Sequence, residues 1–309
     1  MRKRLICSLL CLLMVCSLPL TVLAEEAEPA EETQPVIETV TLEIETKEEF
    51  LTFAEDCRLD SYSLNLAVTL KDNIDLTGVD FQGVPVFSGS FDGNGYSITG
   101  VNIACNGSVF GLFRYLTQTA QVKNLTVAGT VQPQGSRDTI GGIAGSNAGK
   151  IENCSFDGVI TGGDLVGGIA GYNGVTGMIT DCQASGSIYG DHFVGGIAGE
   201  SNGVIRKCTN AAQINTTPQQ NSVDVSEITI ETLTGAEAAD TVTDIGGIAG
   251  ISSGVIRDCE NRGHIGYQHI GYNIGGIAGC QTGYITNCDN YGAISGRKEV
   301  GGIVGHMEP

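Results

Sequence analysis

Apolar residues recur at fixed offsets along the second half of the chain, and polar residues alternate with them within short segments. The triplet Gly-Gly-Ile begins at positions 141, 167, 195, 246, 275 and 301. In most repeats a second isoleucine ends a Gly-x-Ile triplet, a cysteine follows three residues later, and a third isoleucine follows six residues after the cysteine. Alternate positions between that cysteine and the third isoleucine are mostly polar, which predicts strands with one buried face.

The length of the repeat and its glycines predict a parallel β-helix, or solenoid. Successive Gly-Gly-Ile triplets are 26, 28, 51, 29 and 26 residues apart. We expect three short strands per unit with glycines at the bends, so that each unit forms one coil of about 26 residues. Stacked coils lie about 4.8 Å apart, which places equivalent residues above one another. The long interval is one unit plus a polar, threonine-rich insertion at residues 215–243.

Stacking predicts rows of identical side chains inside this all-β solenoid. A buried isoleucine contributes about 1.5–3 kcal/mol, and a buried free cysteine behaves as a small apolar side chain. A degenerate early repeat supports a packing role, because matching VKNLTVAGTV to IENCSFDGVI places Leu125 in the position of Cys154. The predicted structural ladder consists of Ile143, Ile169, Ile197, Ile248, Ile277, Cys154, Cys182, Cys208, Cys259 and Cys288.

The cysteines also have alternative interpretations. Secretion permits disulfides between coils, although parallel neighbours about 4.8 Å apart do not match the Cβ spacing of about 3.5–4.5 Å that a disulfide needs. A zinc site needs close ligand pairs such as C-x-x-C, which the chain lacks after residue 24. The segment GSNAGKI at 145–151 has neither the spacing nor the Ser/Thr of a phosphate-binding P-loop. We therefore expect no catalytic, cofactor-binding or metal-binding residues.

The beginning of the chain has the pattern of a secretory signal peptide. Basic residues at 2–4 precede an apolar segment, and small residues at 22–24 offer a cleavage site. We expect residues 1–24 to be removed after Ala24, and the protein to be secreted or held at the cell surface. A membrane anchor is the alternative, which Pro19 disfavours because it interrupts the apolar segment.

Three further regions follow the signal peptide. Residues 25–40 are acidic, contain two prolines and predict a disordered linker. Residues 41–105 are expected to form an N-terminal cap helix and irregular first coils, with Thr46 and Glu49 as a capping box. Residues 106–309 hold the regular repeats and the insertion.

Charge excludes some classes of partner. The formal net charge is −19, so the surface repels nucleic acid and anionic membranes. No segment after the signal peptide is long and apolar enough to span a bilayer. The chain stops within a unit, at VGGIVGHMEP. Because an open last coil exposes an unpaired edge, we expect either a C-terminal continuation or a partner that covers it.

The unit GGIAGxxxGxIxxC…GxI resembles the GLUG repeat, a motif of bacterial secreted and surface proteins that also occurs in non-catalytic parts of IgA-specific metalloendopeptidases. The segment FSGSFDGNGYSITGVNI resembles the sequence that leads into such arrays, so the likeness extends roughly from Phe87 to Gly305. It implies a bacterial source and a right-handed coil. It implies no catalysis, because the zinc motif H-E-x-x-H is absent from the chain.

Three classes of function fit these observations. The first is a non-catalytic extracellular or cell-surface scaffold, adhesin-like or ligand-presenting, in which the insertion is either a binding loop or a tolerated excursion. The second is a glycan-binding module that uses tyrosines as stacking platforms, namely Tyr172, Tyr189, Tyr267, Tyr272, Tyr284 and Tyr291. We expect no cofactor, and an extracellular protein or glycan as partner.

The third class is a carbohydrate-active enzyme. Hydrolysis of a glycosidic bond needs two carboxyl groups about 5–9.5 Å apart. The outward acids that could supply them are Asp157, Asp181, Asp258, Glu260 and Asp289. Asparagine replaces aspartate in the turn before several cysteines, and turn formation explains that exchange without catalysis. We therefore expect a protein that is not an enzyme.

Overall fold

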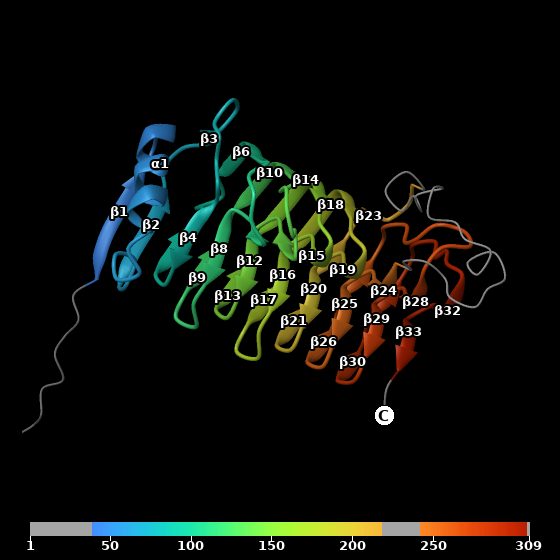
Figure 1. Ribbon diagram of the computed structural model, residues 1–309. Helices are drawn as coiled ribbons and strands as arrows, with labels where there is room; N and C mark the ends of the chain where they lie inside the picture. Colours follow the sequence, from blue (N-terminus) through green and yellow to red (C-terminus); the bar gives the residue numbers. More distant parts are fainter. Residues whose placement is uncertain (1–38, 218–241, 308–309) are drawn as a thin grey trace, which may run out of the picture. The chain divides into compact units, whose positions relative to one another are not determined.

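The computed structural model describes residues 39–217 and 242–307, and the predicted signal peptide, most of the linker and most of the insertion lie outside the described residues. The described chain is a parallel β-solenoid, in which strands of successive coils lie side by side (Figure 1). Its strands form four sheets, each named here after its first strand in the sequence.

The strands are short because each ends at a corner of the coil. The β1 sheet contains β1 (Val40–Ile44), β2 (Leu66–Leu70), β5 (Ser90–Asp92), β9 (Gln121–Lys123), β13 (Lys150–Glu152), β17 (Met178–Thr180), β21 (Val204–Arg206), β26 (Val255–Arg257) and β30 (Tyr284–Thr286). The β3 sheet contains β3 (Ile74–Asp75), β6 (Ser97–Ile103), β10 (Thr126–Val131), β14 (Ser155–Thr161), β18 (Gln183–Tyr189), β22 (Thr209–Asn210), β23 (Gln213–Ile214), β27 (Glu260–Asn261) and β31 (Asp289–Asn290).

The other two sheets complete each coil. The β4 sheet contains β4 (Val84–Phe87), β8 (Phe113–Leu116), β12 (Ala144–Asn147), β16 (Ala170–Asn173), β20 (Ala198–Ser201), β25 (Ala249–Ser252), β29 (Ala278–Gln281) and β33 (Val304–Met307). The β7 sheet contains β7 (Val109–Phe110), β11 (Thr139–Gly141), β15 (Asp164–Gly167), β19 (His192–Gly195), β24 (Thr243–Gly246), β28 (Tyr272–Gly275) and β32 (Lys298–Gly301).

A regular coil therefore has four strands, and the expectation of three was wrong. The Gly-Gly-Ile segment does not form one continuous strand with the residues around it, because a corner lies between β11 and β12. At this corner a side chain on Gly142 would overlap the ring of Phe156 from the core. Glycine therefore lets the backbone turn against the core at a point where the sequence pattern shows only an apolar segment.

The register of the coils follows the repeat. Ile151 pairs with Ile179, 28 residues later, and Ile179 pairs with Ile205, 26 residues later. Ile205 then pairs with Ile256, across the interval that contains the insertion. Strands β19 and β24, on either side of the insertion, also pair directly, with His192 opposite Thr243. The insertion therefore leaves the stacking of the core unbroken.

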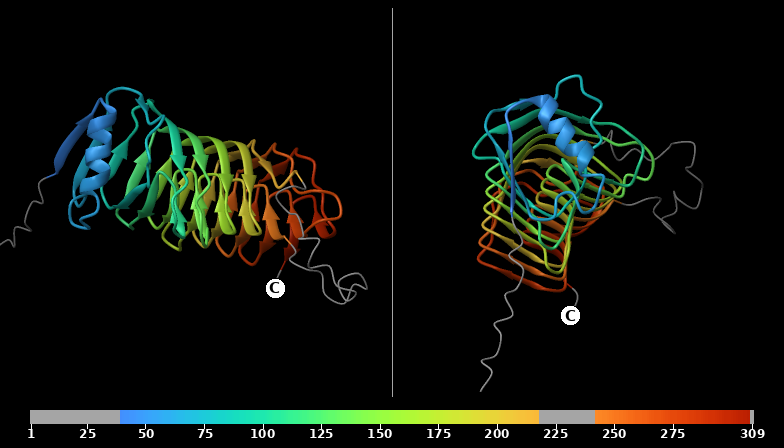
Figure 2. Two further views of the ribbon diagram at one scale, coloured as in Figure 1. Left: turned by 45° about the horizontal axis from the view of Figure 1, so that its top comes forward. Right: turned by 90° about the vertical axis from the view of Figure 1, so that its left-hand side faces the viewer.

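One α-helix, α1 (Lys47–Asp56), packs at the N-terminal end of the described chain (Figure 2). The predicted capping box is present, since Glu49 N donates to Thr46 Oγ1 at 3.2 Å and Thr46 N donates to Glu49 Oε2 at 3.0 Å. The buried ring of Phe53 lies 5.8 Å from that of Phe87 and 5.9 Å from that of Phe91. The helix therefore covers core side chains of the first coils. Within the described ranges, no helix is long and apolar enough to cross a membrane.

The opposite end of the solenoid is less covered. Strands β30, β31, β32 and β33 each occupy the end of their sheet. Ile303 is 40% exposed there, although its equivalent one coil earlier, Ile277, is fully buried. The expected continuation or partner at this end remains a prediction.

Candidate functional site

The first isoleucine of each unit lies at the corner between the β7 and β4 sheets. Its backbone is hydrogen-bonded from coil to coil: Ile143 N donates to Ile169 O at 3.0 Å, and Ile169 N donates to Ile197 O at 2.9 Å. The side chains fill the interior, with no exposed surface at any of Ile143, Ile169, Ile197, Ile248 and Ile277.

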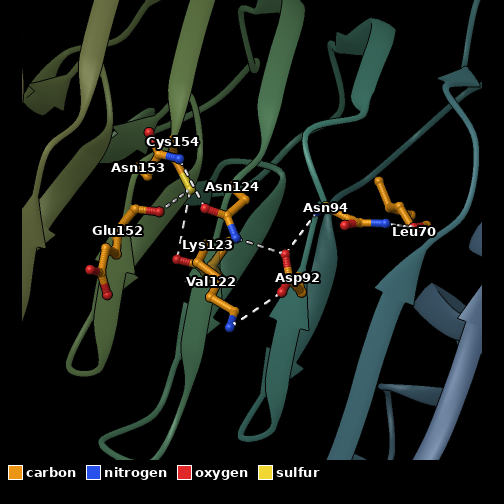
Figure 3. A network of polar contacts seen from close by, with 9 residues as sticks. All are labelled: Leu70, Asp92, Asn94, Val122, Lys123, Asn124, Glu152, Asn153 and Cys154. Carbon is orange, nitrogen blue, oxygen red and sulfur yellow. Dashed lines mark hydrogen bonds and ion pairs between the residues drawn. The ribbon is translucent and has the colours of Figure 1, made fainter.

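The cysteines lie at the corner between the β1 and β3 sheets. Cys154, Cys182, Cys208 and Cys259 are buried, and Cys288 in the last coil is half-buried. Each Sγ donates to the carbonyl two residues earlier, as Cys154 does to Glu152 O at 3.3 Å (Figure 3). The five cysteines of this row are free thiols, so no disulfide joins adjacent coils at this corner.

Burial disfavours the thiolate form of Cys208, at the centre of this row. Burial, together with hydrogen bonds to the thiols of Cys182 and Cys259, raises the pKa of Cys208. Since the thiolate is the form that attacks electrophiles and binds metals, a raised pKa makes both less favourable. Among residues 39–217 and 242–307, no group of three or more His, Cys, Asp or Glu side chains is placed to hold a metal ion.

The position before each cysteine of the row, and before Leu125 in the degenerate repeat, has a left-handed backbone. The φ angle is 53° at Asn124, 50° at Asn153 and 53° at Asp181, a conformation that asparagine and aspartate tolerate better than most residues. Their side chains also join adjacent coils, because Asn153 Nδ2 donates to Asn124 Oδ1 at 2.9 Å and Asn124 Nδ2 donates to Asp92 Oδ1 at 3.0 Å (Figure 3). Backbone geometry thus accounts for acidic residues in this corner.

Two of the other outward acids bond to neighbouring side chains. Asp157 Oδ1 accepts from Ser185 Oγ at 2.6 Å, and Glu260 forms an ion pair with Arg262 at 2.8 Å. These contacts give both carboxylates a local structural role. The contacts do not mark either carboxyl group as the acid or the base of a pair that could hydrolyse a glycosidic bond.

Sequence reasoning missed a row of buried amides. Asn210 and Asn261 have no exposed surface, and Asn261 Nδ2 donates to Asn290 Oδ1 at 2.7 Å in the next coil. Each of these residues follows its cysteine by two positions, in CTN, CEN and CDN. That recurrence was a usable signal. Residues two positions apart on a strand share a face, so the alternation itself places this asparagine beside the inward cysteine.

The six candidate tyrosines are not brought together on one face. Tyr284 lies on the β1 sheet, Tyr189 on the β3 sheet, Tyr172 on the β4 sheet and Tyr272 on the β7 sheet. Tyr172 is half-buried, and its hydroxyl accepts from Asn202 Nδ2 at 3.2 Å. The six tyrosines therefore do not form one shared surface on which a glycan could stack.

One tyrosine does line a groove. A hollow of about 500 Å³ lies outside the last coils, beside the corner that follows the β3 sheet. Gln213, His264, Tyr267, Gln268 and Ser295 contribute to its wall. The amides and the hydroxyls are uncharged hydrogen-bonding groups, and Tyr267 is 39% exposed. Such a lining suits an uncharged, polyhydroxylated ligand.

Comparison with known families identifies the repeat. The GLUG motif matches residues 137–161 and 162–189, two adjacent coils. Halomucin from Haloquadratum walsbyi is 33% identical over 88 residues, which are 28% of this chain and 1% of halomucin. A candidate Gly-rich membrane protein from Evansella cellulosilytica is 36% identical over 73 residues, 23% of this chain and 8% of that protein. The chain thus matches only small parts of both relatives.

Solved structures share the fold of this chain. A candidate immunoglobulin A1 protease from Bacteroides ovatus has a TM-score of 0.57 at 18% identity, over 85% of this chain and 84% of that one. A chain described as IgA1 protease has a TM-score of 0.55 at 17% identity, over 79% of this chain and 19% of that one. At these identities the likeness concerns the fold alone.

Proposed function

The chain carries GLUG repeats wound into a parallel β-solenoid, and from this we propose a non-catalytic scaffold, secreted or held at the cell surface, that presents ligand-binding surfaces in an adhesin-like way. One contrast carries the proposal: the interior rows repeat, whereas the outward positions change from coil to coil. The outward row that begins each strand of the β1 sheet includes Lys150, Met178, Val204, Val255 and Tyr284. A constant core with a variable surface suits a scaffold.

Two further observations support this proposal over an enzyme. The one reactive side chain that recurs in the regular coils, the cysteine, is packed inside, where it is out of reach of a substrate in solution. The relatives named halomucin and Gly-rich membrane protein favour a place outside the cell or at its surface. The names of the two protease chains suggest proteolysis, but their likeness to this chain is one of fold.

The location and the absence of catalysis have separate tests. An antibody against the solenoid should label intact cells of the source organism as strongly as permeabilised cells, because the epitope is outside. Labelling of permeabilised cells alone would refute the surface location. The purified protein, incubated with plant and bacterial polysaccharides and with immunoglobulin A1, should release no reducing ends and no fragments. Either product would contradict the scaffold.

The groove favours a second candidate, binding of a neutral glycan without turnover. Tyr267 offers a ring for stacking on a sugar, and Gln213 and Gln268 offer amides for its hydroxyls. On a glycan array, a neutral hit should weaken at least tenfold in Tyr267→Ala. Tyr291→Ala, which removes a tyrosine that is 66% exposed and outside the groove lining, should keep the hit. An array without neutral hits would exclude this candidate.

A further inference from the structure

Two arginines stand in register on adjacent coils of the β1 sheet. Arg206 of β21 pairs with Arg257 of β26, so their Cα atoms are separated by one coil step of about 4.8 Å. Like charges placed directly opposite each other on one sheet face destabilise it. This protein has a formal net charge of −19, yet neither arginine takes part in an ion pair within the described residues.

The surroundings leave part of this cationic pair without a partner. Arg206 Nε is buried and has no hydrogen-bond partner in the described structure. The register neighbours of the pair are uncharged, with Thr180 before Arg206 and Thr286 after Arg257. Lys207 lies at the adjacent corner, and Asp181 and Asp258 take the same corner position one coil before and one coil after it. With the two arginines, these groups carry three positive and two negative charges, so the face keeps a net positive charge.

An apolar row runs beside the arginines on the same outward face. Met178, Val204, Val255 and Tyr284 follow one another in register. Val204 and Val255 precede the arginines by two residues on the same strands, a separation of about 6.8 Å along the strand. Tyr284 at the end of the row is 77% exposed. The face therefore combines two arginines in register with a strip of apolar surface that ends in an aromatic ring.

We propose that this face binds an anionic polysaccharide, whose carboxylate or sulfate groups accept hydrogen bonds from Arg206 and Arg257 while its sugar rings pack on the apolar row. Guanidinium groups hold carboxylates and sulfates through paired, charge-assisted hydrogen bonds. Tyr284 supplies a ring on which the less polar face of a sugar can stack. This surface is separate from the groove, and the proposal goes beyond the scaffold function by naming a ligand class.

The sheet geometry favours a polysaccharide over an acidic peptide. Strands β21 and β26 are paired on both sides, so they offer no free edge to which a peptide strand could add. Carboxylates on one face of an extended peptide repeat about every 6.8 Å, whereas the arginines repeat about every 4.8 Å. Recognition here therefore depends on side chains alone. Charges farther than about 8 Å are largely screened at physiological salt, so the carboxylates that oppose binding are mainly those of the adjoining Asp181 and Asp258.

The test measures binding of the purified protein to heparin and to polygalacturonate by isothermal titration calorimetry at 150 mM and at 1 M salt, with dextran as the neutral control. Binding of at least one polyanion at 150 mM salt, its loss at 1 M salt and no binding of dextran are expected. The double variant Arg206→Gln/Arg257→Gln should lose affinity at least tenfold. The double variant Arg58→Gln/Arg297→Gln removes the same charge elsewhere and should bind within twofold of the unmodified protein.

A variant that is expected to bind more tightly separates loss of the binding site from misfolding, because a misfolded protein would not gain affinity. Thr286→Arg extends the cationic row by one coil, since Thr286 is the register neighbour of Arg257, and it should raise affinity at least threefold. Binding of neither polyanion, equal losses in both double variants, or no gain in Thr286→Arg would each overturn the proposal. Preference for poly-L-glutamate over both polysaccharides would assign the face to an acidic peptide instead. None of these outcomes depends on where the protein resides in the cell.

Discussion

The side-chain amide of Asn210 donates a hydrogen bond to the side-chain carbonyl of Asn261 at 2.8 Å, although 51 residues separate them in sequence. The bond joins two adjacent coils across the position where the insertion leaves the solenoid. Both side chains are fully buried, and the row continues to Asn290 at 2.7 Å. The core is therefore held by hydrogen-bonded amides in addition to aliphatic side chains and thiols.

Removal of the central amide should destabilise the solenoid strongly. Asn261 accepts from Asn210 and donates to Gly263 O at 3.0 Å and to Asn290. Asn261→Ala leaves buried partners unsatisfied, and we expect the free energy of unfolding to fall by about 3 kcal/mol. Urea unfolding followed by circular dichroism measures the change. Asn290→Ala, at the half-buried end of the row, should lower it by only about 1 kcal/mol, and equal effects would argue against a buried hydrogen-bonded row.

Glycine is required where strands β14 and β18 approach each other. Gly158 and Gly186 are register partners, and a side chain on Gly186, whose φ is +95°, would overlap the carbonyl oxygen of Gly158. We expect Gly186→Ala to lower the free energy of unfolding by about 3 kcal/mol or more, since strain and overlap add. Gly78→Ala is the control, because φ is +79° there but no atom lies within 4 Å of the added carbon. Thermal unfolding of the control should show a loss of about 1 kcal/mol, and similar losses in both variants would contradict the overlap.

Thiol accessibility should follow position in the solenoid. Cys105 and Cys288 are half-buried, so iodoacetamide should modify them in the folded protein. Burial raises the pKa of Cys105, but a hydrogen bond with Cys259, together with burial, raises the pKa of Cys288 further, so Cys288 should react more slowly. The inner cysteines should react only after the protein unfolds. They are Cys154, Cys182, Cys208 and Cys259. Peptide mass spectrometry after timed labelling provides the measurement. Rapid native labelling of the inner set would mean that these thiols face solvent.

Cys57 should make stability fall at alkaline pH. Burial, reinforced by Asp56, raises the pKa of this thiol from 9.0 to about 12. Between these values the folded protein keeps a proton that the unfolded chain has lost, so the free energy of unfolding falls as the pH rises. The contribution is complete below pH 9 and declines toward pH 12. In Cys57→Ala, urea unfolding between pH 9 and 11 should show a smaller decline, while Tyr62, whose pKa burial also raises, titrates in both proteins. Parallel curves would refute the assignment.

The sequence by itself determined the repeating part of the fold. The recurrence of isoleucine and cysteine at constant offsets predicted the coils, and the structure contains the parallel solenoid that they implied. Leu125, aligned with the cysteines, is buried at the equivalent corner. The capping box of Thr46 and Glu49 was also visible, because both residues lie within one turn of helix. These features are local or strictly periodic, so each leaves a pattern in a short stretch of sequence.

Tertiary structure alone decided the remaining features. The fourth strand of each coil depends on Gly142 turning against the ring of Phe156 in the core. The facing arginines depend on which two coils become neighbours, since the insertion lies between Arg206 and Arg257 in the sequence. A repeat pattern shows which residues occupy equivalent positions, but only the folded coils bring those residues into contact. The free energy of such a contact depends on how deeply it is buried and on which groups surround it. The order of residues in a short stretch of sequence determines neither the burial nor the surrounding groups.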